Sequence, residues 1–289
     1  MKKYYVITLL LIFIYTCSDE SVIALEPTQE LTLKQVNYVN ENTPIDCQGT
    51  FADFDSQGKI VEVNYVCGID ISIWRTYTYT DLDLISSIAQ GFGAVVYEYE
   101  DDVLVEMRNP GFELKFTYDD NLMIGNVFQF AAPTSRYNIY EFEDDSYTKL
   151  LSITSFDNSS GIDEVVSKIT YQYDGNNPVE IYIEGTPLGG STMEPNWRIN
   201  IAYDDNVNPY KKGLAEQAFL ANETVLRDYV DYNIAFSADN NITSILHEDL
   251  VESTSYTITY SYIYNSDLYP TEALIVDDGL SRTEYFYYY

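Results

Sequence analysis

The chain has 289 residues and a strongly acidic balance, with 46 Asp and Glu residues against 15 Lys and Arg and a formal net charge of −31. An electrostatic field of that sign repels phosphate groups, so we exclude nucleic acid as a partner. Acidic chains that are poor in aromatic residues are often disordered, but 29 Tyr, 13 Phe and 2 Trp give this chain ample apolar surface for a core. The composition therefore predicts a folded, aromatic-rich protein.

The N-terminus has the pattern of an export signal. Lys2 and Lys3 precede an apolar run from Tyr4 to Tyr15, which is too short to cross a bilayer as a permanent helix. We predict a signal peptide over residues 1–16. Its removal leaves 13 basic against 46 acidic residues, a net charge of −33.

The end of this signal carries a lipidation motif. Ile14-Tyr15-Thr16-Cys17 resembles a bacterial lipobox, with Thr16 where Gly or Ala is usual, and Ser18-Asp19-Glu20 resembles the acidic tag that sends lipoproteins of the Bacteroidota to the outer face of the outer membrane. The resemblance implies lipidation of Cys17, a tether over residues 17–30, and anchoring in the outer membrane with the body facing the cell surface. The alternatives are a body on the periplasmic face, and an ordinary signal peptide with an incidental Cys.

A hairpin is predicted between the other two cysteines. Asp55-Ser56-Gln57-Gly58-Lys59 suits a three-residue loop with Gly58 in the left-handed conformation. In that register the numbers of paired residues sum to 114, so Phe54 faces Ile60 and Cys47 faces Cys67. Cross-strand neighbours lie within disulfide reach, and an exported compartment is oxidising. We predict a Cys47–Cys67 disulfide, with two buried free thiols as the alternative.

Two segments favour helix over strand. Thr80 suits a helix N-cap and acids follow it. Apolar residues then recur at helical spacing before Gly91, namely Leu84, Ile85, Ile88 and Ala89. This spacing predicts a short helix packed against the sheet. Lys211–Arg227 also fits a helical face better than an alternating one, so we expect a short helix or an elaborated loop there.

Most of the remaining chain alternates with the period of a β-strand. In Lys168–Glu184, Ile169, Tyr171 and Tyr173 alternate with polar residues, stop at a cluster of turn formers, and are followed by a second alternating run. This pattern predicts a β-hairpin. Three turns share one motif, an apolar residue, a spacer, Tyr and Asp: Phe116-Thr117-Tyr118-Asp119-Asp120-Asn121, Tyr171-Gln172-Tyr173-Asp174-Gly175-Asn176 and Ile201-Ala202-Tyr203-Asp204-Asp205-Asn206.

The repeated motif resembles the tyrosine-aspartate repeats of large bacterial surface proteins. More closely, the chain is similar to uncharacterised lipoprotein families of the Bacteroidota, one of which is described as porin-like; that resemblance spans about residues 50–289 and implies no activity. The uneven turn spacing excludes a solenoid with a fixed repeat. We predict an all-β fold with one domain over residues 31–289: a many-stranded antiparallel meander of hairpins, curled into a barrel-like or strongly curved sheet, with one or two short helices.

Candidate site residues are few. Trp74 and Trp197 are candidates for a ligand platform, because aromatic rings stack on sugars; ordinary packing in a sheet is the alternative. His247 is the only histidine, and we expect it at a surface strand end, since no nucleophile motif accompanies it. We interpret the acidic turns as turn chemistry rather than calcium sites, and predict no catalytic residue, metal or cofactor.

These observations favour a non-enzymatic binding or scaffolding role, with a glycan or an envelope protein as partner and the membrane reached through the lipid. One alternative is a carboxylate-dependent polysaccharide hydrolase, so the question of an enzyme stays open; another is a surface-layer or adhesion component. A third is an integral outer-membrane β-barrel, since the last strand ends in alternating tyrosines. The residues opposite the tyrosine stripes are polar, Thr257 and Thr259 among them, so we favour a water-soluble barrel with one packed aromatic face.

Overall fold

The computed structural model describes residues 30–40, 47–67, 71–82, 84–90, 93–129, 132–144, 149–186, 192–212, 238–277 and 279–289. The predicted signal peptide, Cys17 and the tether up to residue 29 lie outside these ranges, as do residues 213–227 of the second predicted helix.

Eighteen β-strands account for most of the described residues. They are β1 (Leu33–Asn40), β2 (Cys47–Phe54), β3 (Ile60–Cys67), β4 (Ile71–Tyr79), β5 (Ile85–Gln90), β6 (Gly93–Glu100), β7 (Val103–Asn109), β8 (Phe112–Asp119), β9 (Leu122–Gln129), β10 (Ala132–Phe142), β11 (Leu150–Asp157), β12 (Glu164–Asp174), β13 (Asn177–Gly185), β14 (Glu194–Val207), β15 (Asn240–Asp249), β16 (Thr254–Tyr264), β17 (Pro270–Asp277) and β18 (Leu280–Tyr288). A short 3₁₀ helix, η1 (Pro209–Lys212), follows β14.

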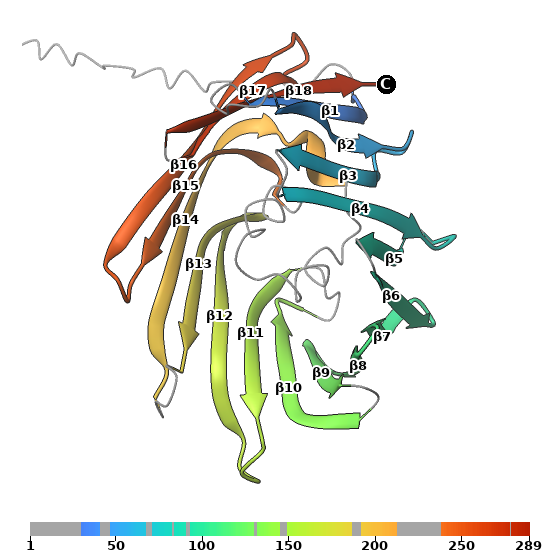
Figure 1. Ribbon diagram of the computed structural model, residues 1–289, viewed down its shortest axis with the longest axis vertical. Coiled ribbons are helices and arrows are strands. Elements are labelled where there is room, and N and C mark those ends of the chain that lie inside the picture. The colour runs from blue at the N-terminus through green and yellow to red at the C-terminus, as the bar shows by residue number, and fades with distance from the viewer. Residues whose placement is uncertain are drawn as a thin grey trace, which may run out of the picture.

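The strands form one closed antiparallel meander. Each strand pairs with the next along the chain, and β18 pairs with β1, where Leu33 faces Tyr288 and Val36 faces Phe286. Figure 1 shows the ring of strands running from β1 through β9 to β10 and back through β16 to β18. The predicted all-β meander is confirmed, and pairing of the first strand with the last makes it a barrel rather than an open sheet.

The helix predicted after Thr80 is wrong, because this segment forms a turn and then strand β5. The N–H groups of Leu82 and Leu84 donate to Oγ1 of Thr80 at 3.3 and 3.2 Å, which closes the turn. Tyr79 then faces Ile85 and Tyr77 faces Ile88, with a register shift between the two pairs. Apart from η1, the residues with assigned secondary structure contain no helix. None of these residues forms a helix long and apolar enough to cross a membrane.

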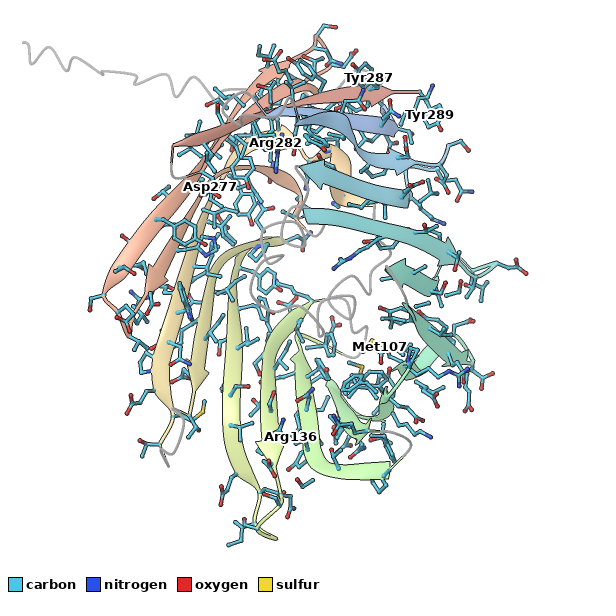
Figure 2. The ribbon with its side chains drawn as sticks, in the orientation of Figure 1. Met107, Arg136, Asp277, Arg282, Tyr287 and Tyr289 are labelled. Carbon is cyan, nitrogen blue, oxygen red and sulfur yellow. The ribbon has the colours of Figure 1, made fainter. Side chains whose placement is uncertain are left out.

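Strand alternation sorts the side chains onto two faces, and the inner face is apolar. Figure 2 places Met107 and Arg282 on the inner side of the ring. The buried residues form two clusters. The mixed cluster comprises Leu33, Val36, Tyr38, Ala52, Phe54, Ile60, Val63, Tyr77, Ile85, Ile88, Tyr97, Leu104, Met107, Leu114, Phe116, Met123, Tyr140, Phe142, Leu150, Ala273 and Phe286. The isoleucine cluster comprises Ile169, Ile181, Ile199, Ile201, Ile242, Ile245, Ile258 and Ile275.

A repeated device joins neighbouring hairpins at the end of the barrel where β1 begins. Most of the hairpins at this end carry a β-bulge next to the turn. In the β6–β7 pair, Glu98 faces Glu106 and Tyr99 faces Leu104, so Val105 of β7 is the extra residue. A tyrosine at the end of each of six even-numbered strands donates its hydroxyl to a carbonyl at the start of the preceding strand. We call these bonds tyrosine latches: Tyr79 to Ile60 (2.7 Å), Tyr99 to Ile85 (2.8 Å), Tyr118 to Leu104 (2.6 Å), Tyr173 to Leu150 (2.8 Å), Tyr203 to Pro178 (2.7 Å) and Tyr288 to Pro270 (2.7 Å).

The latches give the repeated sequence motif a physical reason. A bulge interrupts the regular ladder of backbone hydrogen bonds, and a buried carbonyl that lacks a partner costs free energy. In each latch the acceptor carbonyl lies at the start of an odd-numbered strand, beside the bulge, and the donor is the Tyr that precedes the next turn. The Tyr of the motif therefore serves two purposes, since its ring fills the inner face and its hydroxyl satisfies the backbone.

Candidate ligand-binding surface on the inner wall

An aromatic row crosses three neighbouring strands of the inner wall. Trp197 of β14, His247 of β15 and Tyr256 of β16 form this row. His247 faces both Ile199 and Tyr256, while Trp197 faces Asp249, one step further along β15. Because side chains two residues apart share a face, the row continues the inner face that Ile199, Ile245 and Ile258 occupy. It lies at the end of the barrel opposite the latches.

The ring geometry of the row leaves one aromatic surface accessible. The rings of His247 and Tyr256 stack with centroids 4.5 Å apart and planes within 6°. His247 is 6% exposed, whereas Tyr256 is 42% exposed. The expectation that His247 lies at the surface is therefore wrong, because it stands at an inward position and Tyr256 covers it. A half-exposed ring supported from behind is rigid and apolar, which suits stacking against a flat ligand.

Two carboxylates flank the row. Oδ1 of Asp249, which faces Trp197, accepts the N–H groups of Val251 and Glu252 at 3.0 and 2.9 Å and so shapes the β15–β16 turn. Asp277, labelled in Figure 2, faces Ile258 and is exposed. Aromatic rings beside hydrogen-bond acceptors can hold a polyhydroxylated ligand, since the rings pack on its C–H surface and the carboxylates accept from its hydroxyls.

A buried charged group lies on the wall formed by β18. Nη2 of Arg282 is 2.9 Å from Oε1 of Glu284, and Glu284 is only 4% exposed. The hydroxyl of Tyr210 in η1 donates to Oε2 of Glu284 at 3.2 Å. The Tyr210 ring also contacts Phe286 and Phe54, with centroids 5.7 and 6.2 Å apart. Burial, together with the nearby Glu284 carboxylate, raises the pKa of Tyr210 well above its usual value.

This charged group fixes the connection between β14 and β15. Tyr210 belongs to that connection. Its contacts with Glu284 of β18 and Phe54 of β2 place η1 against these two strands. The sequence analysis missed this site. The sequence did contain a signal. Arg282 and Glu284 lie on the same face of β18 as the apolar residues Phe286 and Tyr288, because all four are spaced two residues apart. Charged residues at apolar positions of a strand indicate a buried polar contact.

The base of the same connection is held by asparagines and aspartates. Asp204 accepts the hydroxyl of Tyr264 and the N–H of Asn206, the latter at 2.9 Å. Nζ of Lys211 is 2.6 Å from Oδ1 of Asp239, whose Oδ2 accepts from Asn176 at 3.0 Å. Within the part of the chain that has coordinates to describe, no group of three or more His, Cys, Asp or Glu residues could hold a metal ion. Asp204 itself lies within β14, which continues to Val207, so the strand does not end at the turn predicted from Asp204 to Asn206.

The two tryptophans are not brought together on adjacent strands. Trp74 lies on β4, where it pairs with Asn64, and Trp197 lies on β14, ten strands further along the meander. Trp197 is instead joined by His247 and Tyr256, which the sequence analysis did not select. A platform made by both tryptophans stays a prediction.

The hairpin between the cysteines has the predicted turn with a shifted register. Gly58 has a φ of 84°, and Phe54 faces Ile60 as predicted. A bulge then moves the pairing by one residue, so Asp53 faces Glu62 and Ala52 faces Val63. The predicted register is wrong beyond the first pair, because one strand carries an extra residue. The β2–β3 pairs that the structure describes end at Ala52 and Val63, before the two cysteines. The disulfide between Cys47 and Cys67 remains a prediction.

Comparisons with known proteins gave structural matches alone. No protein-family model matches the chain, and no curated protein matches it. A porin-like protein from Bacteroides uniformis ATCC 8492 is similar in structure, with a TM-score of 0.43 and 15% sequence identity over 91% of this chain and 100% of that one. A porin-like protein from Bacteroides vulgatus ATCC 8482 is also similar, with a TM-score of 0.38 and 11% identity over 90% of this chain and 99% of that one.

Proposed function

We propose that the protein is a lipid-anchored barrel of the outer membrane whose body stands in water at the cell surface and acts as a binding or scaffolding module. The observation that carries this proposal is the distribution of polarity between the two faces of the barrel. The inner face holds the two apolar clusters. The outer face holds ion pairs, for example on β6–β8.

Two outer walls carry these ion pairs. On β6–β8, Arg108 lies 2.5 Å from Glu98 and Lys115 lies 2.6 Å from Glu113. On β13–β15, Arg198 lies between Glu180 and Glu248, at 3.7 and 3.9 Å. A Lys or Arg on the lipid face of a membrane-spanning barrel costs about 2–4 kcal/mol at the bilayer midplane. Surfaces of this kind favour a body surrounded by water over one embedded in lipid.

The ligand surface that best fits this role is the aromatic row. Trp197, His247 and Tyr256 offer stacking, and Asp249 and Asp277 offer hydrogen-bond acceptors beside it. This chemistry suits a glycan, and we propose a glycan as the ligand. The sequence features that support an anchored location are the lipobox-like segment ending at Cys17 and the acidic residues after it.

Location is tested by fractionation with a Cys17→Ala variant. We expect the unaltered protein in the outer-membrane fraction and accessible to protease added outside the cells, and the variant in the soluble fraction without detergent. An embedded barrel behaves differently, since the variant would then remain in the membrane and need detergent for extraction. That result would overturn the proposal of a water-exposed body.

Ligand binding is tested by applying the purified body, starting at Ser18, to an array of bacterial and plant polysaccharides. We expect binding that falls at least tenfold in a Tyr256→Ala variant, because the exposed stacking ring is lost. Phe128→Ala is the matched control, since Phe128 is an aromatic residue of the outer face, beside Lys115. Equal loss in both variants, or no binding to any glycan, would contradict a glycan site at the aromatic row.

A further inference from the structure

One outer wall of the barrel, where the chain enters the first strand, carries few charges. It is formed by β16, β17, β18 and β1, and we call it the neutral wall. Its outward residues include Thr257, Thr259, Ser261 and Ile263 on β16, Glu272, Leu274 and Val276 on β17, Thr283, Tyr285 and Tyr287 on β18, and Lys34, Gln35, Asn37 and Val39 on β1. Lys34 and Glu272 are the two charged residues among these fourteen, and their charges are opposite. The ion-paired wall on β13–β15 adjoins it through the β15–β16 pair, and the ion-paired wall on β6–β8 lies further around the barrel.

The neutral wall also exposes large apolar side chains. Ile263 is 57% exposed, Leu274 38% and Tyr287 47%. The strand register places Leu274 opposite both Ser261 and Thr283, and Tyr285 opposite Glu272. Apolar residues therefore alternate with polar ones across neighbouring strands, so the exposed apolar side chains are spread over the whole wall. The wall combines large apolar side chains with few charges.

The position of the tether indicates what this wall meets. Strand β1 belongs to the wall, and the predicted lipid site at Cys17 precedes Thr32 by fifteen residues, which reach about 50 Å when extended. Where the tether joins β1, the N–H of Tyr289 donates to the carbonyl of Thr32, and Nζ of Lys34 lies 5.5 Å from the centre of the Tyr289 ring. The anchor therefore holds this wall within reach of the membrane.

Charge favours the approach of a wall with few charges. With a net charge of −31 for the full sequence, most of the body is repelled by anionic lipid headgroups within a Debye length of about 10 Å. The neutral wall contributes little to that repulsion. Tyrosine is enriched where proteins meet the headgroup region, because its ring is apolar and its hydroxyl is polar. Tyr285, Tyr287 and Tyr289 supply three such residues near the tether.

We propose that the neutral wall rests on the headgroup region of the membrane that holds the lipid anchor. This inference rests on the proposed lipid anchor. The barrel then lies on its side, with Ile263, Leu274 and Tyr287 at the membrane surface and the ion-paired walls turned toward water. The aromatic row lies at one end of the barrel, where the half-exposed Tyr256 stays accessible to a soluble ligand.

The test attaches the body to vesicles without using Cys17. The body, starting at Ser18 with an N-terminal polyhistidine tag, is bound to phosphatidylcholine vesicles that contain nickel-chelating lipid. Tyr287→Trp reports on the neutral wall and Phe128→Trp on the outer face of β9, with the unsubstituted body as background for Trp74 and Trp197. We expect brominated lipids to quench the added Trp of Tyr287→Trp at least twice as strongly as that of Phe128→Trp. Equal quenching of the two would overturn the proposal.

A charge placed on the wall provides a second readout. In the Tyr287→Trp background, Leu274→Glu is expected to return the quenching to the level of the Phe128 reporter, whereas Thr117→Glu on the outer face of β8 leaves it unchanged. Unaltered quenching with Leu274→Glu would overturn the proposal. A concentration-dependent dimer of the free body that Leu274→Glu dissociates would also overturn it, by assigning the wall to a second copy. Because attachment uses the tag, absence of Cys17 lipidation in cells would contradict the proposed anchor and leave this measurement intact.

Discussion

The two apolar clusters of the barrel solve the same packing problem with different residues. The isoleucine cluster spans β12–β17 and contains isoleucine alone, on strands that include the 14-residue β14. The mixed cluster uses Leu, Met, Phe, Tyr and other residues, and much of it lies on shorter strands such as the six-residue β5. A β-branched side chain is stiff and suits an extended strand, whereas flexible and aromatic side chains adapt to shorter ones. Strand length therefore accompanies the choice of core residue, while register shifts occur beside both clusters.

The clusters meet at a seam made by Ile153 and Tyr171. Both side chains are partly buried and pack against members of both clusters. Ile153 of β11 faces Ile169, and Tyr171 of β12 faces Ile181, so the seam lies at the β11–β12 boundary. If the clusters pack as separate units, substitutions deep in each should change the free energy of unfolding independently. Substitutions at the seam should affect the packing of both clusters.

The largest expected loss of stability comes from truncating one buried side chain in each cluster. Phe142→Ala in the mixed cluster should cost about 3–5 kcal/mol and Ile245→Ala in the isoleucine cluster about 2–5 kcal/mol, because both side chains are fully buried and leave cavities. We expect the double variant to lose the sum to within about 0.5 kcal/mol, as for distant sites. Urea unfolding of the single and double variants measures this. A clear departure from additivity would show that the barrel has one coupled core.

A smaller loss of stability is expected when the hydroxyl of Tyr171, at the seam, ionises at high pH. Burial raises the pKa of Tyr171 to about 12. In the unfolded chain this hydroxyl ionises near pH 10, so the folded state holds its proton longer and stability falls as the pH rises from about 10 to 12. The full loss is up to about 3 kcal/mol at pH 12, and part of it is expressed by pH 11. Unfolding free energies at pH 8–11 should fall less steeply for Tyr171→Phe than for the unaltered protein. Identical slopes would place Tyr171 in contact with water.

The smallest effect is expected from the latches, which occur beside both clusters. Tyr118→Phe and Tyr203→Phe each remove one hydroxyl and keep the ring, so each should cost about 1 kcal/mol for the lost hydrogen bond. Similar costs in the two variants would indicate that the latch works alike in the mixed and isoleucine halves. As a control, Tyr287→Phe removes a hydroxyl from an exposed side chain and should change stability by less than about 0.5 kcal/mol. Costs as small as this control for both latch variants would argue against the latch.

Sequence patterns predicted the strands well where the register is regular, and failed at a bulge. In β5 the inward residues Ile85 and Ile88 are three apart, because the register shift inserts a residue between them. That spacing is the same as on one face of a helix, which is why the segment suggested one. The bulge between Asp53 and Phe54 likewise displaced the predicted register by one residue. Bulges depend on pairing with a neighbouring strand, which local periodicity does not contain.

The candidate site was predicted in part. Trp197 was selected as an aromatic residue, but its neighbours His247 and Tyr256 come from strands about 50–60 positions later, and their alignment depends on the β14–β16 register. The contact of Tyr210 with Glu284 spans 74 positions and was not predicted at all. Strand alternation gives the face of each residue. Which residues become neighbours across the barrel follows from the order and stagger of the strands.

Closure of the barrel through β1 and β18 has a consequence for assembly. The sheet has no free edge for another chain to extend, which protects a tyrosine-rich β-protein against aggregation. The barrel closes late, because Leu33 must pair with Tyr288 after nearly the whole chain has been made. Contacts so distant in sequence slow folding, and until the last strand arrives both β1 and the newest strand remain exposed. For a chain exported as proposed above, this vulnerable state would occur on the far side of the membrane, where a chaperone that shields strand edges would be of greatest use.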